Sequence, residues 1–229
     1  GIVVAHEEFS ALLHTLREGR RLFSNFRKAL AFYLGAKSAL LLLFLLAPLP
    51  LFPLQIILLE LFMDVGASTT FTLEPADGDL MLLPPRHPSL PFFDTELLQG
   101  TLAGGASLLL VVLLSGGGPG GQGGREGGRE DAAEYRQSLY FYGWLLGHVF
   151  LALHLRSLHQ PLLIKGLFSN PAFLVWAGAV LLLVLLLALL PPLGQALGLV
   201  CLPWQEWLRL CFLAFVGTGW MEGWKVGRW

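Results

Sequence analysis

The sequence predicts an all-α membrane protein, a bundle of six transmembrane helices with an N-terminal cytoplasmic helical stalk. Two observations on composition and one on pattern support this fold class. Of the 229 residues, 55% are hydrophobic and only 14% are charged, whereas a soluble domain carries about a quarter charged residues. The mean hydropathy is +0.64. The apolar residues also gather in runs of about 20, the length that a helix needs to cross the hydrocarbon core.

The stalk comes first along the chain. Residues 2–22 predict an amphipathic helix, and EGRR followed by SNFRKAL predicts its continuation at the membrane surface into the first apolar run. The chain starts at Gly1, with neither a methionine nor a signal-peptide pattern, so we expect a fragment of a longer protein.

Six apolar runs follow, each with the length of a transmembrane helix. In chain order they are 29–47, 51–71, 96–115, 138–155, 172–190 and 203–221. Pro53 adds a break near the outer end of the second run. The glycines of 100–105 suit helix packing, and the aromatic YFYGW of the fourth run suits anchoring at the interface. Glu206 and Arg209 lie near the outer end of the sixth run, from which their charged groups reach water.

The segments between the runs have the composition of loops. APLPLFP and PPLGQALGLVCLP are short and uncharged, as outer hairpins are. GGGPGGQGGREGG, residues 116–128, is a low-complexity sequence that predicts a flexible spacer on the outer side.

The basic residues indicate the orientation of the bundle. With six spans, most of them fall on one side: Arg17, Arg20, Arg21, Arg27, Lys28, Arg86, Arg156, Lys165, Lys225 and Arg228. The other side holds Arg125, Arg129 and Arg136, which four acidic residues offset. Because cytoplasmic loops carry an excess of Lys and Arg, both termini are expected in the cytoplasm. The even number of spans agrees with this orientation.

Several classes of protein are disfavoured by the same sequence. The net charge is -1, so no basic face for nucleic acid is expected. Cys201 and Cys211 lack metal or redox spacing and are expected to be packing residues of the membrane helices. We find no phosphate-binding loop, no His/Cys metal cluster and no nucleophile elbow. Hence no catalytic residue and no cofactor-binding residue is predicted on this chain.

Two carboxylates form the candidate site. Ionisable groups inside transmembrane helices are costly and mark functional positions. Glu60 and Asp64 lie within the second run, in LLELFMDVGAS, and four residues apart they share one face of a helix. Two carboxylates on one face suit a hard cation or a proton. The small residues 66–69 permit close packing or local unwinding, which frees carbonyls as ligands. We therefore predict that Glu60 and Asp64 line a cation pathway.

Lys37 and His148 extend this candidate site. Lys37, in the first run, either neutralises one carboxylate or acts as a tethered internal cation in the place of a metal ion. Both roles reduce the number of metal cations bound. The alternative is a structural ion pair that only ties two spans together. His148, in the fourth run, is either a pathway residue or a hydrogen-bonded packing residue.

Four segments together resemble the calcium-pump-like branch of the P-type cation-transporting ATPases. EGRRLFSNFRKALAFYL (18–34) resembles the stalk and start of the fifth membrane helix. PLQIILLELFMDVGASTTFTLEPADGDLMLLPPRHP (53–88) resembles the sixth helix and the loop after it, with Asp64 at the family's sixth-helix aspartate. ALHLRS (152–157) resembles the end of the eighth helix, and NPAFLVWAG (170–178) the start of the ninth. The resemblance covers essentially the whole chain.

The resemblance implies a division of the chain and a set of ligand positions. Residues 1–28 would be the end of the phosphorylation domain and the stalk, and residues 29–229 the C-terminal transmembrane domain. Glu60 and Asp64 fall on sixth-helix ligand positions, and His148 falls close to the eighth-helix ligand. Lys37 lies near a fifth-helix position where calcium pumps carry an amide, and Leu40 falls where they carry a carboxylate. These departures leave a proton, magnesium and a monovalent cation open as the transported ion.

The resemblance also implies partners. These are the lipid bilayer, the transported cation and the missing N-terminal part of the pump, with its actuator, nucleotide-binding and phosphorylation domains and first four helices. The chain lacks the DKTG, TGE and GDGxND motifs, so it is not expected to hydrolyse ATP alone. Mg-ATP is implied for the intact pump, in which phosphorylation would move the stalk and open Glu60 and Asp64 alternately to each side. The expected location is a prokaryotic plasma membrane.

Two other interpretations stay open. A split or degenerate pump half would be a non-enzymatic, stand-alone membrane protein, acting as a partner subunit or a passive ion pathway. The sequence upstream of Gly1 would distinguish this protein from a pump. An unrelated six-span channel or carrier would be expected to show a pore loop or an inverted repeat, and neither is visible.

Overall fold

The computed structural model describes residues 9–46, 51–78, 80–82, 84–87, 89, 91–117, 129–158 and 160–227, without the side chains of Phe9, Phe62, Met63, Asp64 and residues 129–131. All regular structure in this part of the chain is helical, as the sequence predicted. The elements are α1 (Phe9–Leu46), α2 (Pro53–Leu58), the π-helix η1 (Leu59–Val65), α3 (Gly66–Thr72), α4 (Thr95–Gly117), α5 (Arg129–Leu155), α6 (Leu162–Lys165), α7 (Pro171–Leu189), α8 (Pro191–Ala196) and α9 (Trp204–Val226).

Five segments of the described chain are long and apolar enough to cross a membrane. They are α1, the continuous α2–η1–α3 segment, α4, α5 and α7, and they coincide with the first five predicted runs. Helix α9 fills the sixth run with 23 residues but does not belong to this group. Its apolar stretch is shortened by Glu206 and Arg209 near its start and by Glu222 and Lys225 near its end. The all-helical fold is therefore confirmed for the described residues, with five candidate membrane spans, and the sixth span stays a prediction.

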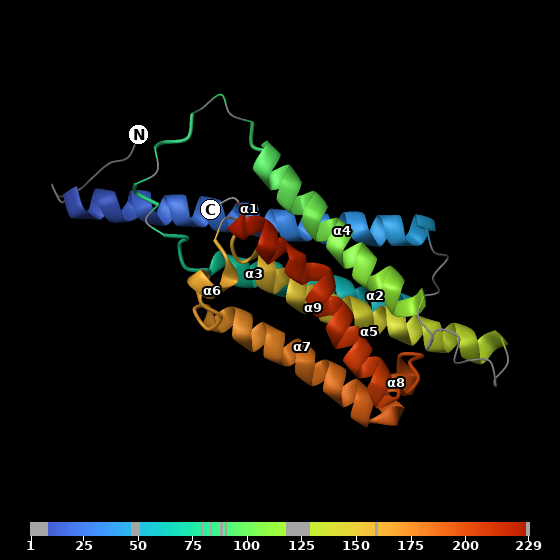
Figure 1. The fold of residues 1–229 in the computed structure, drawn as a ribbon. Coiled ribbons are helices and arrows are strands. Elements are labelled where there is room, and N and C mark those ends of the chain that lie inside the picture. The colour runs from blue at the N-terminus through green and yellow to red at the C-terminus, as the bar shows by residue number, and fades with distance from the viewer. Residues whose placement is uncertain are drawn as a thin grey trace.

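Helix α1 joins the stalk to the first span without a break. It has 38 residues, which at about 1.5 Å per residue makes a helix of about 57 Å. This exceeds the roughly 30 Å of a hydrocarbon core. Its N-terminal part accordingly projects beyond the ends of the other helices (Figure 1). The predicted helical continuation from the stalk into the first span is thus present from Phe9 onward, and residues 1–8 lie outside the described residues.

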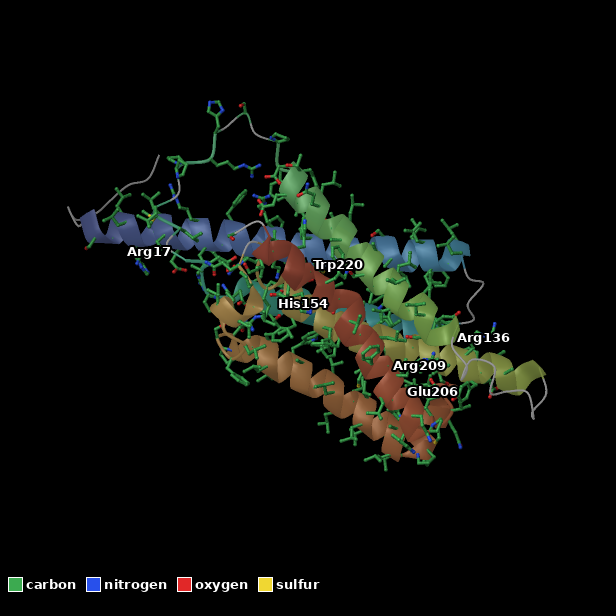
Figure 2. The ribbon with its side chains drawn as sticks, viewed as in Figure 1. Arg17, Arg136, His154, Glu206, Arg209 and Trp220 are labelled. Carbon is green, nitrogen blue, oxygen red and sulfur yellow. The ribbon has the colours of Figure 1, made fainter. Side chains whose placement is uncertain are left out.

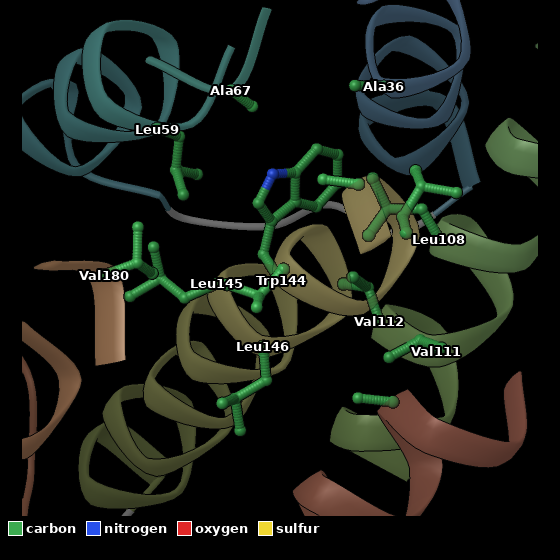
Figure 3. Close-up of a cluster of buried hydrophobic side chains, with 14 of the residues drawn as sticks. Ala36, Leu59, Ala67, Leu108, Val111, Val112, Trp144, Leu145, Leu146 and Val180 are labelled. Atoms are coloured by element: carbon green, nitrogen blue, oxygen red, sulfur yellow. The ribbon is translucent and has the colours of Figure 1, made fainter. Parts of the chain in front are cut away.

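Helix α5 forms the centre of the bundle. It packs against α4 and α9 and also contacts α1 and α7. Figure 3 shows Trp144, Leu145 and Leu146 of α5 projecting into the core between the other helices. The buried partners that surround them come from five other elements, α1, η1, α3, α4 and α7: Ala36, Leu59, Ala67, Leu108, Val111, Val112 and Val180. Figure 1 shows α7 at one edge of the bundle and α4 across α1 at the other.

The α1–α4 crossing depends on glycine. A Cβ atom on Gly35 would lie 3.0 Å from the carbonyl oxygen of Thr101 and 3.1 Å from the backbone nitrogen of Gly105. A Cβ atom on Gly105 would lie 2.9 Å from the carbonyl oxygen of Gly35. The two backbones therefore touch, which is the close approach that small residues permit between membrane helices. This contact fixes the position of α1 shortly before Lys37.

Candidate functional site

The second predicted span is interrupted at its carboxylates. The π-helix η1 covers Leu59–Val65 and includes both Glu60 and Asp64. In a π-helix the backbone bonds run between residues i and i+5, so the turn is wider than in an α-helix, and such turns occur frequently at functional sites. The sequence predicted local unwinding from the small residues after Asp64. The structure has the irregular turn at the carboxylates themselves, and the chain returns to α-helix at Gly66.

Lys37 and Glu60 lie together. The Lys37 ammonium forms a hydrogen-bonded ion pair with the Glu60 carboxylate, which joins α1 to η1. The Lys37 Nζ atom also lies 5.2 Å from the centre of the Tyr33 ring. The side chains are 26% and 42% exposed, so the pair lies on an open side of this bundle. The structure therefore brings together two of the four predicted site residues; the Asp64 side chain lies outside the described residues.

Two further groups lie near this region of the fold. His148 on α5 is fully buried. Its ring lies 5.4 Å from that of Phe32 on α1 and 5.3 Å from that of Trp144, so aromatic packing holds it between α1 and α5. Ser68, four residues beyond Asp64, has a buried hydroxyl without a hydrogen-bond partner among the described residues. Within the same residues, no group of three or more His, Cys, Asp or Glu side chains is arranged to hold a metal ion.

A second polar site lies where α3 ends. We name it the Glu74 cluster: Lys28, Glu74, Asp77, Arg156, Lys165 and Asn170. Glu74 and Arg156 are both fully buried, and Arg156 donates from Nε and Nη2 to the Glu74 carboxylate at 3.0–3.2 Å. Asn170 Nδ2 donates to the same carboxylate at 2.6 Å. The cluster thus ties the end of α3 to the end of α5 and the start of α7.

Asp77 links the cluster to α1 and α6. Its carboxylate lies 2.9 Å from the Lys28 ammonium and also pairs with that of Lys165. Burial raises the pKa of Asp77, but the two ammonium groups lower it more, so the pKa lies below its ordinary value. Asp77 is therefore held as an anion between two cations.

The stalk part of α1 is bonded to the same loop. Arg20 Nη1 donates to the Leu80 carbonyl at 2.6 Å, and Asn25 Nδ2 donates to the Glu74 carbonyl at 2.6 Å. Together with the Lys28–Asp77 pair, these bonds fasten one face of the stalk to the segment that follows α3. A movement of the stalk would act directly on the end of the span that carries Glu60.

Charged residues near each end of α9 bond it to neighbouring parts of the bundle (Figure 2). At one end, the Glu222 carboxylate accepts hydrogen bonds from the Leu162 backbone at 2.6 Å and from Lys225 at 2.6 Å, and it lies 3.0 Å from His154 Nδ1. At the other end, Glu206 and Arg209 pair at 2.9 Å, and Arg209 donates to carbonyls at the end of α4. Figure 2 shows Glu206, Arg209 and Arg136 at the end opposite His154 and Trp220.

These features define an integral membrane bundle with an ion pair at a break in one of its spans. The chain belongs to the family described as "Cation transporting ATPase, C-terminus", whose model matches residues 48–227. It is thus a C-terminal transmembrane domain of the P-type cation ATPases, as the resemblance implied.

The names of similar proteins are consistent with this family assignment. The calcium-transporting ATPase of Bacillus subtilis (strain 168) is 26% identical over 235 residues, which cover 97% of this chain and 25% of that protein. Calcium-transporting ATPase 1 of Schizosaccharomyces pombe is 25% identical over 210 residues, or 90% of this chain and 21% of that protein. The P-type sodium-transporting ATPase4 of Toxoplasma gondii is 30% identical over 100 residues, or 42% of this chain and 8% of that protein. The chain spans about a quarter of the length of the first two relatives.

Sequence reasoning did not predict the Glu74 cluster. Its members nevertheless lie in or next to the segments that carry the family resemblance: Glu74 and Asp77 in 53–88, Arg156 in ALHLRS and Asn170 in NPAFLVWAG. Those segments are separate in the chain, yet they meet at one point of the fold. Each segment that carries the family resemblance contains a charged or amide residue. That common feature could have indicated the cluster from the sequence.

Proposed function

We propose that this chain is the membrane half of an ATP-driven cation pump, helices five to ten, and that Glu60 and Asp64 line its cation pathway. The observation that carries the proposal is the Lys37–Glu60 pair at a π-helical turn, in a chain of the cation-ATPase family. π-helical turns occur frequently at functional sites, and transporters place ion sites at irregular segments of their membrane helices. The buried Ser68 hydroxyl adds one more oxygen on the same segment.

The pair has two interpretations within this function. Lys37 either neutralises Glu60 or takes the place of one transported cation, and both leave fewer cations bound than two free carboxylates would hold. Calcium, as in the names of the two most extensively matched relatives above, is one candidate ion. The ammonium at Lys37 favours a smaller total cation charge, such as a proton or a monovalent cation.

The remaining parts of the pump belong to the proposal. The actuator, nucleotide-binding and phosphorylation domains and the first four helices would supply Mg-ATP binding and the aspartyl phosphate. Helix α9 would be the sixth span of this half, with both termini in the cytoplasm of a prokaryotic cell. The bonds from Arg20, Asn25 and Lys28 to the loop after α3 would pass the movement of the stalk to Glu60.

The first test replaces the carboxylates in the full-length protein. We expect Asp64→Asn and Glu60→Gln to abolish cation-stimulated ATP hydrolysis and transport into vesicles, with expression unchanged, because the cation loses its charged ligands. Glu206→Gln is the matched control, an acidic residue near the outer end of α9 that should keep activity. Transport that survives Asp64→Asn would remove Asp64 from the pathway.

The second test measures the intact mass of the native protein in source membranes, detected through its MEGWKVGRW tail. A mass several times the 25.1 kDa of this chain supports a complete pump. A mass near 25.1 kDa would instead support the stand-alone membrane protein, acting with a partner chain or as a passive pathway.

A further inference from the structure

The segment between α5 and α7 exposes large apolar side chains. Leu163 is 88% exposed and Phe168 is 80% exposed, and Ile164 and Leu167 are exposed beside them. We name these four residues the α6 patch. Exposed apolar patches of this kind mark an interaction site with protein or membrane. The chain turns sharply here because Gly166 has a positive φ of 87° directly after α6.

The charged groups of the same segment turn inward. The Lys165 side chain is only 3% exposed, because its ammonium pairs with Asp77 and donates to the Pro75 carbonyl. Arg156 Nη1 reaches the Leu167 carbonyl at 2.7 Å from inside the bundle. This arrangement reverses that of a loop in water, in which a lysine faces the solvent and leucine and phenylalanine face the protein.

The patch continues the exposed apolar surface of a candidate membrane span. Phe168 lies three residues before α7 begins at Pro171, and α7 is a candidate membrane span with exposed Leu174, Val175 and Leu182. Figure 1 shows α6 beside the start of α7, level with the end of the bundle, whereas the stalk part of α1 extends farther out. The patch therefore lies at the end of a candidate membrane span, on the side of the bundle from which the stalk part of α1 projects.

We propose that the α6 patch is a membrane-interface anchor whose partner is the lipid bilayer. Apolar segments at this level bury their side chains about 5–10 Å into the boundary between headgroups and acyl chains. Lys165, on the opposite side of α6, binds Asp77, so the lipid contact also steadies the loop that follows α3. The proposal requires only that the chain is an integral membrane protein and does not depend on the proposed pump activity.

Spin-label accessibility tests the anchor in the full-length protein reconstituted into nanodiscs of phosphatidylcholine and phosphatidylglycerol. Leu163→Cys and Phe168→Cys are labelled in a background where Cys201 and Cys211 are replaced by serine. Two controls bracket the result: Leu182→Cys on the lipid-facing side of α7, and Leu13→Cys on the stalk. Because all four positions are exposed, these changes remove little packing.

The two patch labels are expected to collide with oxygen several-fold more than with an aqueous nickel reagent, at a ratio between the two controls and well above that of Leu13→Cys. A ratio equal to that of Leu13→Cys would place the patch in water and overturn the proposal. Low collision with both reagents would show that protein covers the patch, which overturns it as well. Monodisperse elution of each labelled variant separates these outcomes from misfolding.

Discussion

At the scale of single residues, the Glu74–Arg156 pair is expected to contribute most to the stability of the fold. Both side chains are fully buried, and the Arg156 guanidinium donates hydrogen bonds from two of its nitrogens to the Glu74 carboxylate. Removing one partner of such a pair leaves an uncompensated buried charge, which costs about 3–5 kcal/mol. We therefore expect Arg156→Met to lower the free energy of unfolding by about that amount, measured by denaturant titration in detergent micelles.

The control for this change is the surface pair of Glu18 and Arg21, whose side chains are 37% and 27% exposed. Exposed ion pairs contribute about 0–1 kcal/mol, so Glu18→Gln should alter the unfolding midpoint only slightly. Equal losses in Arg156→Met and Glu18→Gln would contradict the assignment of the buried pair as a stability centre.

Asp77 gives a prediction for acidic pH. Although burial opposes ionisation, Lys28 and Lys165 lower the pKa of Asp77 below its ordinary value of 3.8. A carboxyl whose pKa is lowered in the folded state contributes stability above its unfolded pKa, and this contribution is lost as the pH falls through the folded pKa. Wild type should therefore exceed Asp77→Asn in melting temperature by a constant margin at neutral pH. The margin should shrink only below about pH 4.

The measurement is a thermal denaturation series for both proteins in the same detergent. A margin that starts to close near neutral pH would show that Asp77 has a raised pKa and is not held as an anion by the two lysines.

At the scale of helices, the crossing of α1 and α4 sets where Lys37 lies. A Cβ atom on Gly105 would lie 2.6 Å from Ser38 Oγ and 2.9 Å from the Gly35 carbonyl oxygen. Because backbone cannot give way as a flexible side chain does, Gly105→Val should separate the helices at a cost of about 1–3 kcal/mol. Gly178→Val is the matched control, since nothing lies within 4 Å of a Cβ atom there. Similar thermal stability of the two variants would contradict a backbone contact at this crossing.

The same elements show what the sequence could predict. The helices were predictable because a run of about 20 apolar residues is a local signal that a bilayer imposes. The π-helical turn was predictable only as a tendency to unwind, since backbone bonding depends on how the span packs against α1 and α5. Glu74 and Arg156 are 82 positions apart, and no local pattern indicates which arginine meets which loop carboxylate. The contact of Lys37 with Glu60 joins two separate spans. The sequence therefore indicated that Lys37 could pair with a carboxylate, but not that Glu60 is its partner.

At the scale of the whole molecule, two sites lie on one continuous piece of chain. The segment from Glu60 to Asp77 runs through the π-helical turn and α3 into the Glu74 cluster. Both of its ends are bonded to α1, through Lys37 at one end and through Lys28 and Asn25 at the other. Displacement of α1 along its axis would therefore act on the span at both points, as the proposed coupling of the stalk to the cation pathway requires.

Replacement of Lys37 tests how the ammonium takes part in the proposed cation pathway. In the proposed full-length pump, Lys37→Ala removes the positive charge that accompanies Glu60, and the carboxylate would then need a cation from solution. We expect a higher number of cations transported per ATP, or a changed apparent affinity for the cation, measured as ion uptake and ATP hydrolysis in the same vesicles. Lys37→Arg keeps the charge and should restore the original ratio, which a purely steric effect would not predict. If ratio and affinity stay identical in Lys37→Ala, the ammonium only ties α1 to η1, and the cation pathway must be explained without it.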